Sequence, residues 1–401
     1  MTLLPPLPLE EAQARLLSQV SPIGAETVAV EQAIWRHLAG PLHARRTQPA
    51  ADLSAMDGYA VRADDLSGPW RVVGESAAGH PFEGELAHGQ AVRISTGAMM
   101  PGGDCAVLLQ ENASRNTHEI SLNGEGDPST RHVRRAGFDF RSGVEVLGAG
   151  ARIGAAQLAL AVAAGHTQLS VHSRPSLAVL DSGDELCADP GTCAAHQIPA
   201  SNGAMLAAMA APYVLSTQRL GPVPDRIDSM LAALERASDV DVLVTSGGAS
   251  VGDHDLVRPA LEKWGATIDF WRVAMRPGKP LLVARRGRQW VLGLPGNPVS
   301  SYVTAFLFLL PLLRALGGSR DPLPQPITMP IATPLAPTGN RTEFIRARID
   351  NGSLVALGEQ DSSALASLAR AAALIERPAG SPTADAGTLV RAYWLENGGG
   401  A

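Results

Sequence analysis

Cysteine is scarce in this chain, with three residues among 401. Cys105, Cys187 and Cys193 lack the Cys-x-x-Cys spacing that zinc ribbons and many redox sites use. Three cysteines cannot build the multi-bridge framework of a small secreted domain, so a disulfide scaffold is excluded and a reducing compartment fits. We therefore expect no chemical role for Cys187 and Cys193.

Excess positive charge is also absent, because the formal net charge is −6 and the pI is about 5.9. This balance gives no global basic surface for nucleic acid, so we expect no nucleic-acid partner. Of the 33 basic side chains only two are lysines, Lys263 and Lys279. Lys279 lies in the tight turn 276–280, where either chance or a need for a compact ammonium group accounts for it.

Long hydrophobic runs are missing as well. The longest apolar helix candidate, Val299–Leu316, is interrupted by Pro311 and falls short of the roughly 20 residues of a membrane span. The N-terminal residues 1–8 have neither a basic segment nor a long apolar core, so no signal peptide is expected. The sequence favours a cytoplasmic protein without membrane contact.

Apolar residues are present in sufficient number for several folded domains. Hydrophobic residues make up 45% and charged residues 18% of the chain, and domains of roughly 100–200 residues predict two to four of them. Helical patterns at Leu9–Val20 and Thr27–Leu38 are followed by a glycine-rich region of short β-like runs, and a further helix is predicted at Gly154–Ala164. The predicted domains are a helical N-terminal and linking domain (1–49 and 141–172), a β-rich domain (50–140), an α/β domain (173–320) and a C-terminal β domain (321–397).

Strand and helix patterns alternate from residue 175 onward, which predicts a doubly wound parallel sheet with helices on both faces. In such sheets, ligands bind beyond the carboxyl ends of the strands. Three glycine-containing loops follow predicted strands, at Asp181–Glu185, Ser246–Asp255 and Leu294–Pro298. We expect these loops to converge at one edge of the sheet.

The loop Thr245–Asp255 is the most informative of the three. Its glycines allow backbone N–H groups to approach an anion, and the helix predicted at 256–264 would add positive potential. Asp253 and Asp255 end the loop, and acids beside a phosphate site more often hold Mg²⁺ than phosphate. The loop therefore indicates a phosphorylated ligand with a metal ion.

Several motifs together resemble the molybdopterin molybdenumtransferases, the MoeA family, which are related to the E domain of gephyrin. They are Ser54-Ala-Met-Asp-Gly-Tyr-Ala60, Arg93-Ile-Ser-Thr-Gly-Ala98, Arg135-Ala-Gly-Phe-Asp139, Ser182-Gly-Asp-Glu185, Ser246-Gly-Gly-Ala-Ser-Val-Gly252, Arg276-Pro-Gly-Lys-Pro280 and Gly293-Leu-Pro-Gly-Asn-Pro-Val-Ser300. The motifs occur in the family's order and cover nearly the whole chain, so the set is more specific than any one motif.

The resemblance implies both a fold and a reaction. The implied fold is α/β plus β: an elongated multidomain subunit with a central doubly wound molybdopterin-binding domain, working as a homodimer. The implied reaction inserts molybdate into adenylylated molybdopterin with Mg²⁺-dependent release of AMP. Transient contact with a molybdopterin adenylyltransferase and with molybdoenzyme apoproteins is also implied, and the cleft would lie between the central domain and the partner subunit's β-rich domain.

The resemblance also implies roles for particular residues. The implied catalytic acids are Asp57, Asp139, Glu185, Asp225 and Asp255, of which Glu185 and Asp255 would hold the metal. The implied cofactor-binding residues are Thr96, Ser182, Gly183, Asp184, Ser246, Gly247, Gly248, Ser250, Gly252, Arg272, Arg276, Lys279, Pro295, Asn297, Pro298, Ser300, Arg346 and Ser367.

Local patterns alone favour simpler interpretations for several of these residues. Asp57 before a glycine is typical of a turn, and Asp225 is typical of an acid in the first turn of a helix, stabilised by the helix dipole.

The chain also departs from the family pattern at one position. Phe138 stands where the family pattern usually has an acid, which leaves Asp139 as the sole carboxylate there. Arg272, Arg276 and Lys279 would hold the two anionic substrates together, and His254 is interpreted as a surface residue.

Three other functions remain open from the residues. A molybdopterin adenylyltransferase and a nucleotide hydrolase use the same α/β domain, but neither accounts for the motif at 54–60. A scaffold role, as in the gephyrin relative, is unsupported because the chain has no long linkers.

Overall fold

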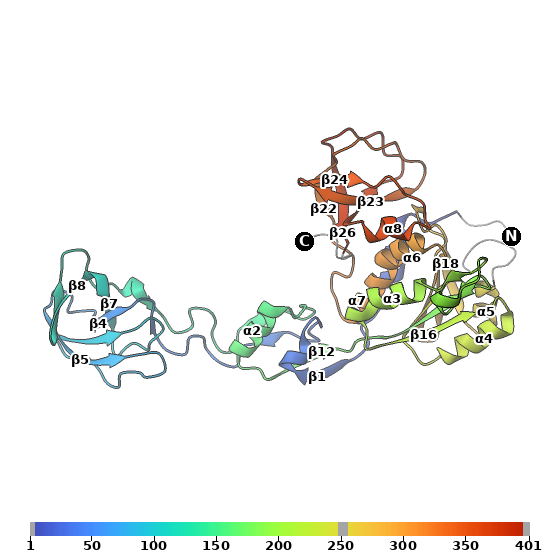
Figure 1. Cartoon of the computed structure of the whole chain (residues 1–401). Helices are drawn as coiled ribbons and strands as arrows, with labels where there is room; N and C mark the ends of the chain where they lie inside the picture. The colour runs from blue at the N-terminus through green and yellow to red at the C-terminus, as the bar shows by residue number, and fades with distance from the viewer. Residues whose placement is uncertain (1–4, 248–255, 396–401) are drawn as a thin grey trace. The chain divides into compact units, whose positions relative to one another are not determined.

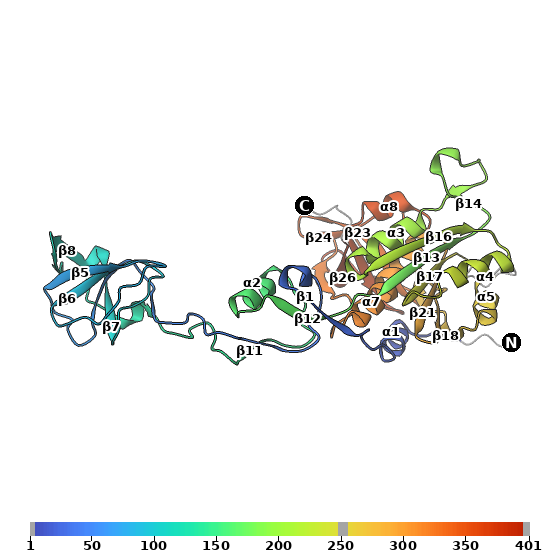
Figure 2. The same cartoon turned by 90° about the horizontal axis from the view of Figure 1, so that it is seen from below.

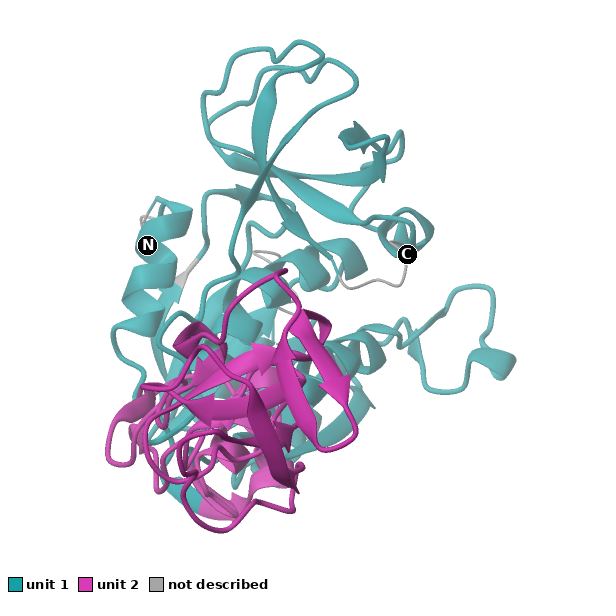
Figure 3. Cartoon of the chain, turned by 90° about the vertical axis from the view of Figure 1, so that its left-hand side faces the viewer, with its two compact units in different colours: residues 1–26, 35–39, 171–401 teal, residues 27–34, 40–170 magenta. Residues whose placement is uncertain are grey.

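The computed structural model describes residues 5–247 and 256–395, which form two compact units (Figure 3). Unit 1 comprises residues 1–26, 35–39 and 171–401, and unit 2 comprises residues 27–34 and 40–170. Unit 1 contains the mixed α/β region together with the C-terminal strands, whereas unit 2 is mainly β-structure.

Unit 2 is built on a six-stranded sheet with the order β7–β4–β6–β5–β9–β8. The strands are β4 (Gly58–Arg62), β5 (Trp70–Ser76), β6 (Gln90–Ile94), β7 (Cys105–Leu109), β8 (Ala113–Asn116) and β9 (Glu119–Leu122). Apolar residues from alternate positions fill its two cores, for example Ala60 and Val92 on one face and Val61 and Ala91 on the other. The prediction of a β-rich region is confirmed, although β4, which follows Asp57 directly, was not predicted.

Shorter elements complete this part of the chain. They are β2 (Leu42–His43), β3 (Leu53–Ser54), β10 (Val133–Arg134), β11 (Glu145–Leu147), α2 (Ala155–Ala163), and the single 3₁₀ turns η2 (Gln110–Asn112) and η3 (Thr130–His132). Helix α2 confirms the predicted helix 154–164. The pairs β3–β10 and β2–β11 are both antiparallel.

The helix predicted at 27–38 is wrong. Residues Ala25–Ala29 instead form strand β1, which pairs with β12 (Gln168–His172), and Val30–Ala33 form one 3₁₀ turn, η1. Trp35 then adopts a left-handed backbone (φ 64°), which is incompatible with a continuing right-handed helix. Pairing with a distant strand has overridden the local helical pattern.

Unit 1 contains a six-stranded sheet with the order β16–β13–β17–β21–β20–β18 (Figure 2). The strands are β13 (Ser176–Ser182), β16 (Ser216–Val223), β17 (Val242–Ser246), β18 (Thr267–Trp271), β20 (Leu282–Arg286) and β21 (Gln289–Leu294). The first four strands in this order are parallel, and β20 and β18 are antiparallel to their neighbours. The predicted parallel core is confirmed, with an antiparallel addition at one edge.

Helices cover both faces of this sheet, as predicted (Figure 1). The helices are α1 (Leu9–Leu17), α3 (Asn202–Ala210), α4 (Ile227–Arg236), α5 (Val257–Lys263), α6 (Pro298–Thr304) and α7 (Leu310–Leu316), with η5 (Ala211–Tyr213) after α3. Leu177 and Val179 of β13 pack in one core with α1, α3, α6 and α7. Ala178 and Leu180 pack in the other core with α4 and α5, as the alternation of side chains along a strand requires.

The apolar segment Pro298–Leu316 is a core helix that Pro311 does not break. A π segment, η6 (Ala305–Leu309), joins α6 to α7, and the widened turn accommodates the missing N–H of Pro311. Gln13 of α1 donates to the Leu307 carbonyl (2.9 Å). In a regular α-helix the backbone N–H of residue 311 would donate to this carbonyl, but Pro311 has no N–H. By length and composition this helix could cross a membrane, but 89% of its apolar stretch is buried inside the protein.

The C-terminal strands form a second six-stranded sheet in unit 1. It contains β19 (Met275–Arg276), β22 (Ile327–Pro330), β23 (Thr342–Asp350), β24 (Ser353–Ala356), β25 (Ala373–Arg377) and β26 (Leu389–Trp394), and helix α8 (Leu365–Ala369) lies between β24 and β25. Strand β19 pairs in parallel with β23, so the chain segment after β18 takes part in this sheet. The rings of Phe306 and Tyr393, 5.9 Å apart, join the sheet to the core helix.

Candidate functional site

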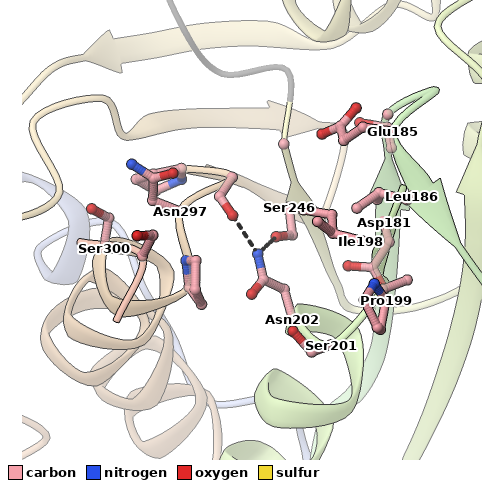
Figure 4. A pocket seen from close by; sticks show the side chains of 18 of the residues that line it. Asp181, Glu185, Leu186, Ile198, Pro199, Ser201, Asn202, Ser246, Asn297 and Ser300 are labelled. Carbon is pink, nitrogen blue, oxygen red and sulfur yellow. Dashed lines mark hydrogen bonds between the residues drawn. The ribbon is translucent and has the colours of Figure 1, made fainter. Parts of the chain in front are cut away.

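A cavity of about 790 Å³ opens in unit 1 at the carboxyl ends of the parallel strands. Its lining comes from the loops after β13, β17 and β21, as Figure 4 shows for the labelled side chains. The described parts of the three predicted loops therefore converge at one edge. A cavity of this size falls within the range of small-molecule and cofactor sites.

Other walls of the cavity come from segments that were not predicted to line it. Two short strands, β14 (Leu186–Cys187) and β15 (Ile198–Pro199), pair in parallel at the ends of an arm that also contains the 3₁₀ turn η4 (Pro190–Thr192). Leu186 and Ile198 of this arm line the cavity, and so do Ser363 and the first residue of α8, Leu365. Apolar side chains thus surround part of an opening whose floor is polar.

Asn202 ties the loops of the cavity together. Its amide nitrogen donates to Ser246 Oγ (2.9 Å) and to the Gly296 carbonyl (2.7 Å), as the dashed lines in Figure 4 show. One side chain at the start of α3 thereby fixes the end of β17 and the loop after β21. Asn202 was not predicted as a site residue because its partners lie 44 and 94 positions away in the chain.

Helix α3 has no side-chain cap from the residue before it. Ser201 occupies the N-cap position with a helical backbone conformation, and its side chain makes no capping hydrogen bond. Instead Asp181, on the neighbouring strand β13, accepts from the Gly203 backbone N–H (3.2 Å). An orphan donor of the helix is therefore satisfied from another element.

Asp181 is the buried acid of the cavity, with 4% of its surface exposed. Burial raises the pKa of its carboxyl from 3.8 to about 6, against the opposing effects of Arg219 and the Gly203 hydrogen bond. Ser182 follows it, also buried, and its hydroxyl has no hydrogen-bond partner among the described residues. Two polar side chains thus lie at the cavity floor without full hydrogen bonding.

Glu185 is an exposed acid of the same loop and also lines the cavity. Within residues 5–247 and 256–395 no hydrogen bond or ion pair reaches its carboxylate, whereas its backbone carbonyl accepts from Ile198 (2.8 Å). Asp184 and Asp225 bridge two loops reciprocally: Asp225 N–H donates to Asp184 Oδ1 (3.1 Å), and Asp184 N–H donates to Asp225 Oδ2 (3.4 Å). Asp225 precedes α4 by two residues, so it is a loop residue and not the helix residue that was expected.

The backbone geometry after β17 explains why a glycine, Gly247, stands there. Its backbone is left-handed (φ 98°), and a Cβ atom there would lie 2.5 Å from the Ser182 carbonyl oxygen. Strands β13 and β17 therefore approach closely where their loops begin, and any larger residue would separate them.

The remaining predicted residues of the last loop lie around the same opening. Pro295, Asn297, Pro298 and Ser300 all line the cavity. Asn297 donates from Nδ2 to Ser362 Oγ (2.8 Å), which connects the loop to the C-terminal segment.

The predicted cations occupy the segment between β18 and β20. Arg272 has a left-handed backbone (φ 92°), which is uncommon for a residue with a side chain. Arg276 is exposed on β19 and pairs with Glu343 (3.4 Å). Lys279 is exposed in the turn that follows, and its neighbour Pro280 lines the cavity, so this turn reaches the rim of the opening.

Arg346 and Ser367 stabilise a loop in the C-terminal part of unit 1. Arg346 is 1% exposed, and its guanidinium donates to the backbone carbonyls of Glu359 and Asp361 (2.9–3.0 Å). Ser367 Oγ donates to the Glu359 carbonyl (2.7 Å). Both hold the loop 357–363 in place, and that loop carries Ser362 and Ser363.

Asp57 and Thr96 of unit 2 contact each other. The Thr96 backbone N–H donates to Asp57 Oδ1 (2.7 Å), and this hydrogen bond, aided by Arg93, lowers the pKa of the exposed Asp57 carboxyl below its usual value. Arg93 in turn lies over the ring of Tyr59, with its guanidinium carbon 5.8 Å from the centroid. The sequence motifs at 54–60 and 93–98 are thus adjacent in space.

Asp139 lies on a neighbouring exposed loop of unit 2. The loop is held by Asp52, which accepts from Arg135 Nη1 (2.7 Å) and from the Ala136 N–H (2.8 Å). The Asp139 N–H donates to the Gln48 carbonyl (3.0 Å), and its side chain is exposed. Phe138 beside it is 76% exposed.

Part of the predicted site falls outside the described residues. Gly248, Ser250, Gly252 and Asp255 lie there, together with Asp253 and His254. Among the residues that the structure does describe, no group of three or more His, Cys, Asp or Glu side chains is arranged to hold a metal ion.

Comparison with known families places matches along almost the whole chain. A model of the MoeA N-terminal region (domain I and II) matches residues 7–165, and a model of a probable molybdopterin binding domain matches residues 178–315. A model of the MoeA C-terminal region (domain IV) matches residues 328–395. The three matches occur in chain order without overlap.

Individual relatives agree with these matches. The molybdopterin molybdenumtransferase of Haemophilus influenzae is 34% identical over 82% of this chain and 82% of its own length. The enzyme of the same name from Bacillus subtilis is 32% identical over 98% and 95%. A crystal structure of the molybdopterin biosynthesis MoeA protein of Pyrococcus horikoshii superposes with a TM-score of 0.78 and 28% identity, covering 97% of this chain and 99% of that one.

Proposed function

This chain belongs to the molybdopterin molybdenumtransferase family of molybdenum cofactor biosynthesis, and we propose that it inserts molybdate into adenylylated molybdopterin and releases AMP. The observation that carries the proposal is the cavity at the carboxyl ends of β13, β17 and β21. Its volume suits a pterin joined to a nucleotide, and its floor and rim offer buried hydroxyls, carboxylates and nearby cations.

Holding two anions together is the main electrostatic task of this reaction. Arg272, Arg276 and Lys279 supply positive charge from the segment beside the cavity, and guanidinium groups suit the oxygens of phosphate or molybdate. Ser182 offers an unpartnered hydroxyl to the same ligand from the floor. We assign substrate binding to these residues and to Gly183, Asp184, Ser246, Gly247, Pro295, Asn297, Pro298 and Ser300.

Mg²⁺ fits the donor set of the cavity. The Glu185 carboxylate has no hydrogen bond within the described ranges, and Mg²⁺ is usually held by one or two carboxylates together with substrate phosphates and water. When bound, Mg²⁺ supplies charge neutralisation at the diphosphate. We assign Glu185 and Asp255 as its protein ligands, with Glu185 also orienting the water that opens the link to AMP.

We further propose that the protein acts as a homodimer in the cytoplasm. Asp57, Thr96 and Asp139 would then orient substrate at the cavity of the partner subunit, and Asp225 would support the loop of Asp184. Transient contact with a molybdopterin adenylyltransferase would deliver the substrate, and contact with molybdoenzyme apoproteins would take the product.

An adenylyltransferase function is not favoured. The relatives that match 82% and 98% of the chain are molybdenumtransferases, and the N- and C-terminal family models cover regions beyond the shared α/β domain.

The decisive experiment measures AMP release from adenylylated molybdopterin with Mg²⁺, in the presence and absence of molybdate. We expect release that depends on molybdate and stops when the metal is chelated. Equal release without molybdate would replace the proposal with a nucleotide hydrolase. Binding without any release would point to a chain that needs a partner protein.

A further inference from the structure

Asp181 occupies a position where the fold by itself calls for an apolar side chain. Leu177 and Val179 precede it on the same face of β13, and both are fully buried in the core shared with α3. Asp181 continues this face at the end of the strand and is 96% buried, yet it lines the cavity. An ionisable group at such a position lowers stability unless something compensates it.

The groups around Asp181 only partly offset the cost of burying its carboxylate. The Gly203 N–H donates to Oδ2 (3.2 Å), while no hydrogen bond to Oδ1 is found in the part of the chain that the structure describes. Arg219 on β16 is the cation whose charge acts on the carboxylate, and helix α3, which packs against it, carries no charged residue. Glu185 and Asp225, also at the cavity, add further negative charge.

The chain also keeps space for this carboxylate. A Cβ atom on Gly203 would lie 2.2 Å from Asp181 Oδ2, so any other residue at the start of α3 would displace the acid. Capping α3 alone does not require an acid, because Ser or Asn accepts from a backbone N–H equally well and has a smaller desolvation cost. The presence of an acid at this position therefore points to a hydrogen-bond donor that the ligand supplies.

We propose that Asp181 binds the pterin ring of the substrate through the ring N–H and exocyclic amino group of its aminopyrimidinone edge. The proposal rests on the proposed function, which supplies a pterin as the ligand. That edge presents two adjacent hydrogen-bond donors and no acceptor between them, so it is complementary to an ionised carboxylate. The adenine edge instead places an acceptor beside its amino group, which an ionised carboxylate repels.

This assignment divides the cavity into two parts. The pterin lies at the floor against Asp181 and α3, and the phosphates and nucleotide extend toward Glu185 and the end of β17. Asp181 is accordingly a specificity residue that touches substrate away from the reacting bonds.

The test compares two fluorescent ligands that differ at one group. 6-Hydroxymethylpterin carries the 2-amino group, and 6-hydroxymethyllumazine carries a carbonyl oxygen there. We expect the native protein to bind the pterin about tenfold more tightly, because a lost charge-assisted hydrogen bond is worth about that factor. Asp181→Asn should lose or invert this preference, since its amide offers a donor to the lumazine oxygen, while AMP affinity stays within about twofold.

Two controls separate recognition from stability. Asp241→Asn changes an acid at the opposite end of the same sheet, where Oδ2 accepts from Ser176, and it should keep the pterin preference. Asp181→Ser keeps a cap acceptor for Gly203 and should lose the preference even if Asp181→Asn folds poorly. Pterin affinity of the native protein should also fall as the pH drops below about 6, where Asp181 becomes protonated.

Each remaining outcome contradicts the inference. A pterin preference that survives in both Asp181 variants, or a native protein that binds neither ring at the floor, overturns the assignment of Asp181. A loss of AMP affinity with unchanged pterin affinity would place the nucleotide there instead. Molybdate-dependent AMP release by the native protein would leave the proposed function standing in all three cases.

Discussion

Asp181 in unit 1 and Asp57 in unit 2 are the same type of residue in opposite environments, and their pKa values shift in opposite directions. Each carboxylate accepts one backbone N–H, from Gly203 at 3.2 Å and from Thr96 at 2.7 Å. Asp57 is exposed, and its pKa is lowered by that hydrogen bond, whereas burial raises the pKa of Asp181 to about 6. Burial, more than hydrogen bonding, therefore decides the sign of the shift.

This difference suggests distinct tasks for the two regions. The loop of unit 2 keeps an acid ionised and accessible at the surface, which suits a group that completes a site formed elsewhere. The cavity of unit 1 keeps an acid buried and incompletely hydrogen-bonded, which suits recognition of a ligand that supplies the missing donors. Variants in each region can test whether the two tasks are separate.

The largest effect is expected from Glu185→Gln. The carboxylate faces the cavity without a hydrogen bond among the described residues, so its neutral isostere should leave the fold intact and remove the proposed metal ligand. We expect AMP release to fall by about a thousandfold while ligand binding persists, in line with losing an electrostatic contribution to the transition state. Glu10→Gln, an exposed acid in the first turn of α1, is the matched control and should retain full activity.

The next effect tests whether units 1 and 2 serve one site across two subunits. Asp57→Asn and Glu185→Gln subunits, each nearly inactive alone, are co-expressed and assayed together. If the protein forms the proposed homodimer and its two subunits share each site, about a quarter of the native activity should return, because half of the dimers are mixed and each mixed dimer has one intact site. No recovery, with mixed dimers verified by differential tags, would mean that both residues act within one subunit.

The sequence predicted the sheet of unit 1 and the edge where its loops meet, because buried strands and glycine loops leave strong local patterns. It did not predict Asn202 as the link between loops, nor the contribution of Ser363 and Leu365, because these contacts join residues far apart in the chain. The helix expected at 27–38 failed for the same physical reason: pairing of β1 with β12 is invisible to local periodicity. Asp181 was visible as the first residue of the predicted loop Asp181–Glu185, but its burial was not.

A smaller effect concerns stability in the absence of ligand. The pKa of Asp181 is higher in the folded chain than in the unfolded one, so the folded state binds more protons between pH 3.8 and about 6, and stability falls as the pH rises through that interval. Asp181→Asn should remove this penalty and raise the free energy of unfolding at pH 7 by at most about 3 kcal/mol. The gain should vanish near pH 4. Urea unfolding of the ligand-free protein at both pH values measures it, and a variant less stable than the native protein at pH 7 would contradict a strained acid.

The smallest effect is the change in the free energy of unfolding caused by Asp57→Asn. Its sign should be opposite to that of Asp181→Asn. The pKa of Asp57 is lowered in the folded chain, so its contribution is present above pH 3.8 and is lost as the pH falls through the lower folded-state value. The variant should therefore be slightly less stable than the native protein at pH 7 and equally stable in acid. Unfolding curves of unit 2, followed separately from unit 1 by hydrogen exchange of the β4 and β6 amides, detect so small a change. If Asp57→Asn instead stabilised the protein at neutral pH, as Asp181→Asn should, the contrast between a satisfied surface acid and a strained buried one would be lost.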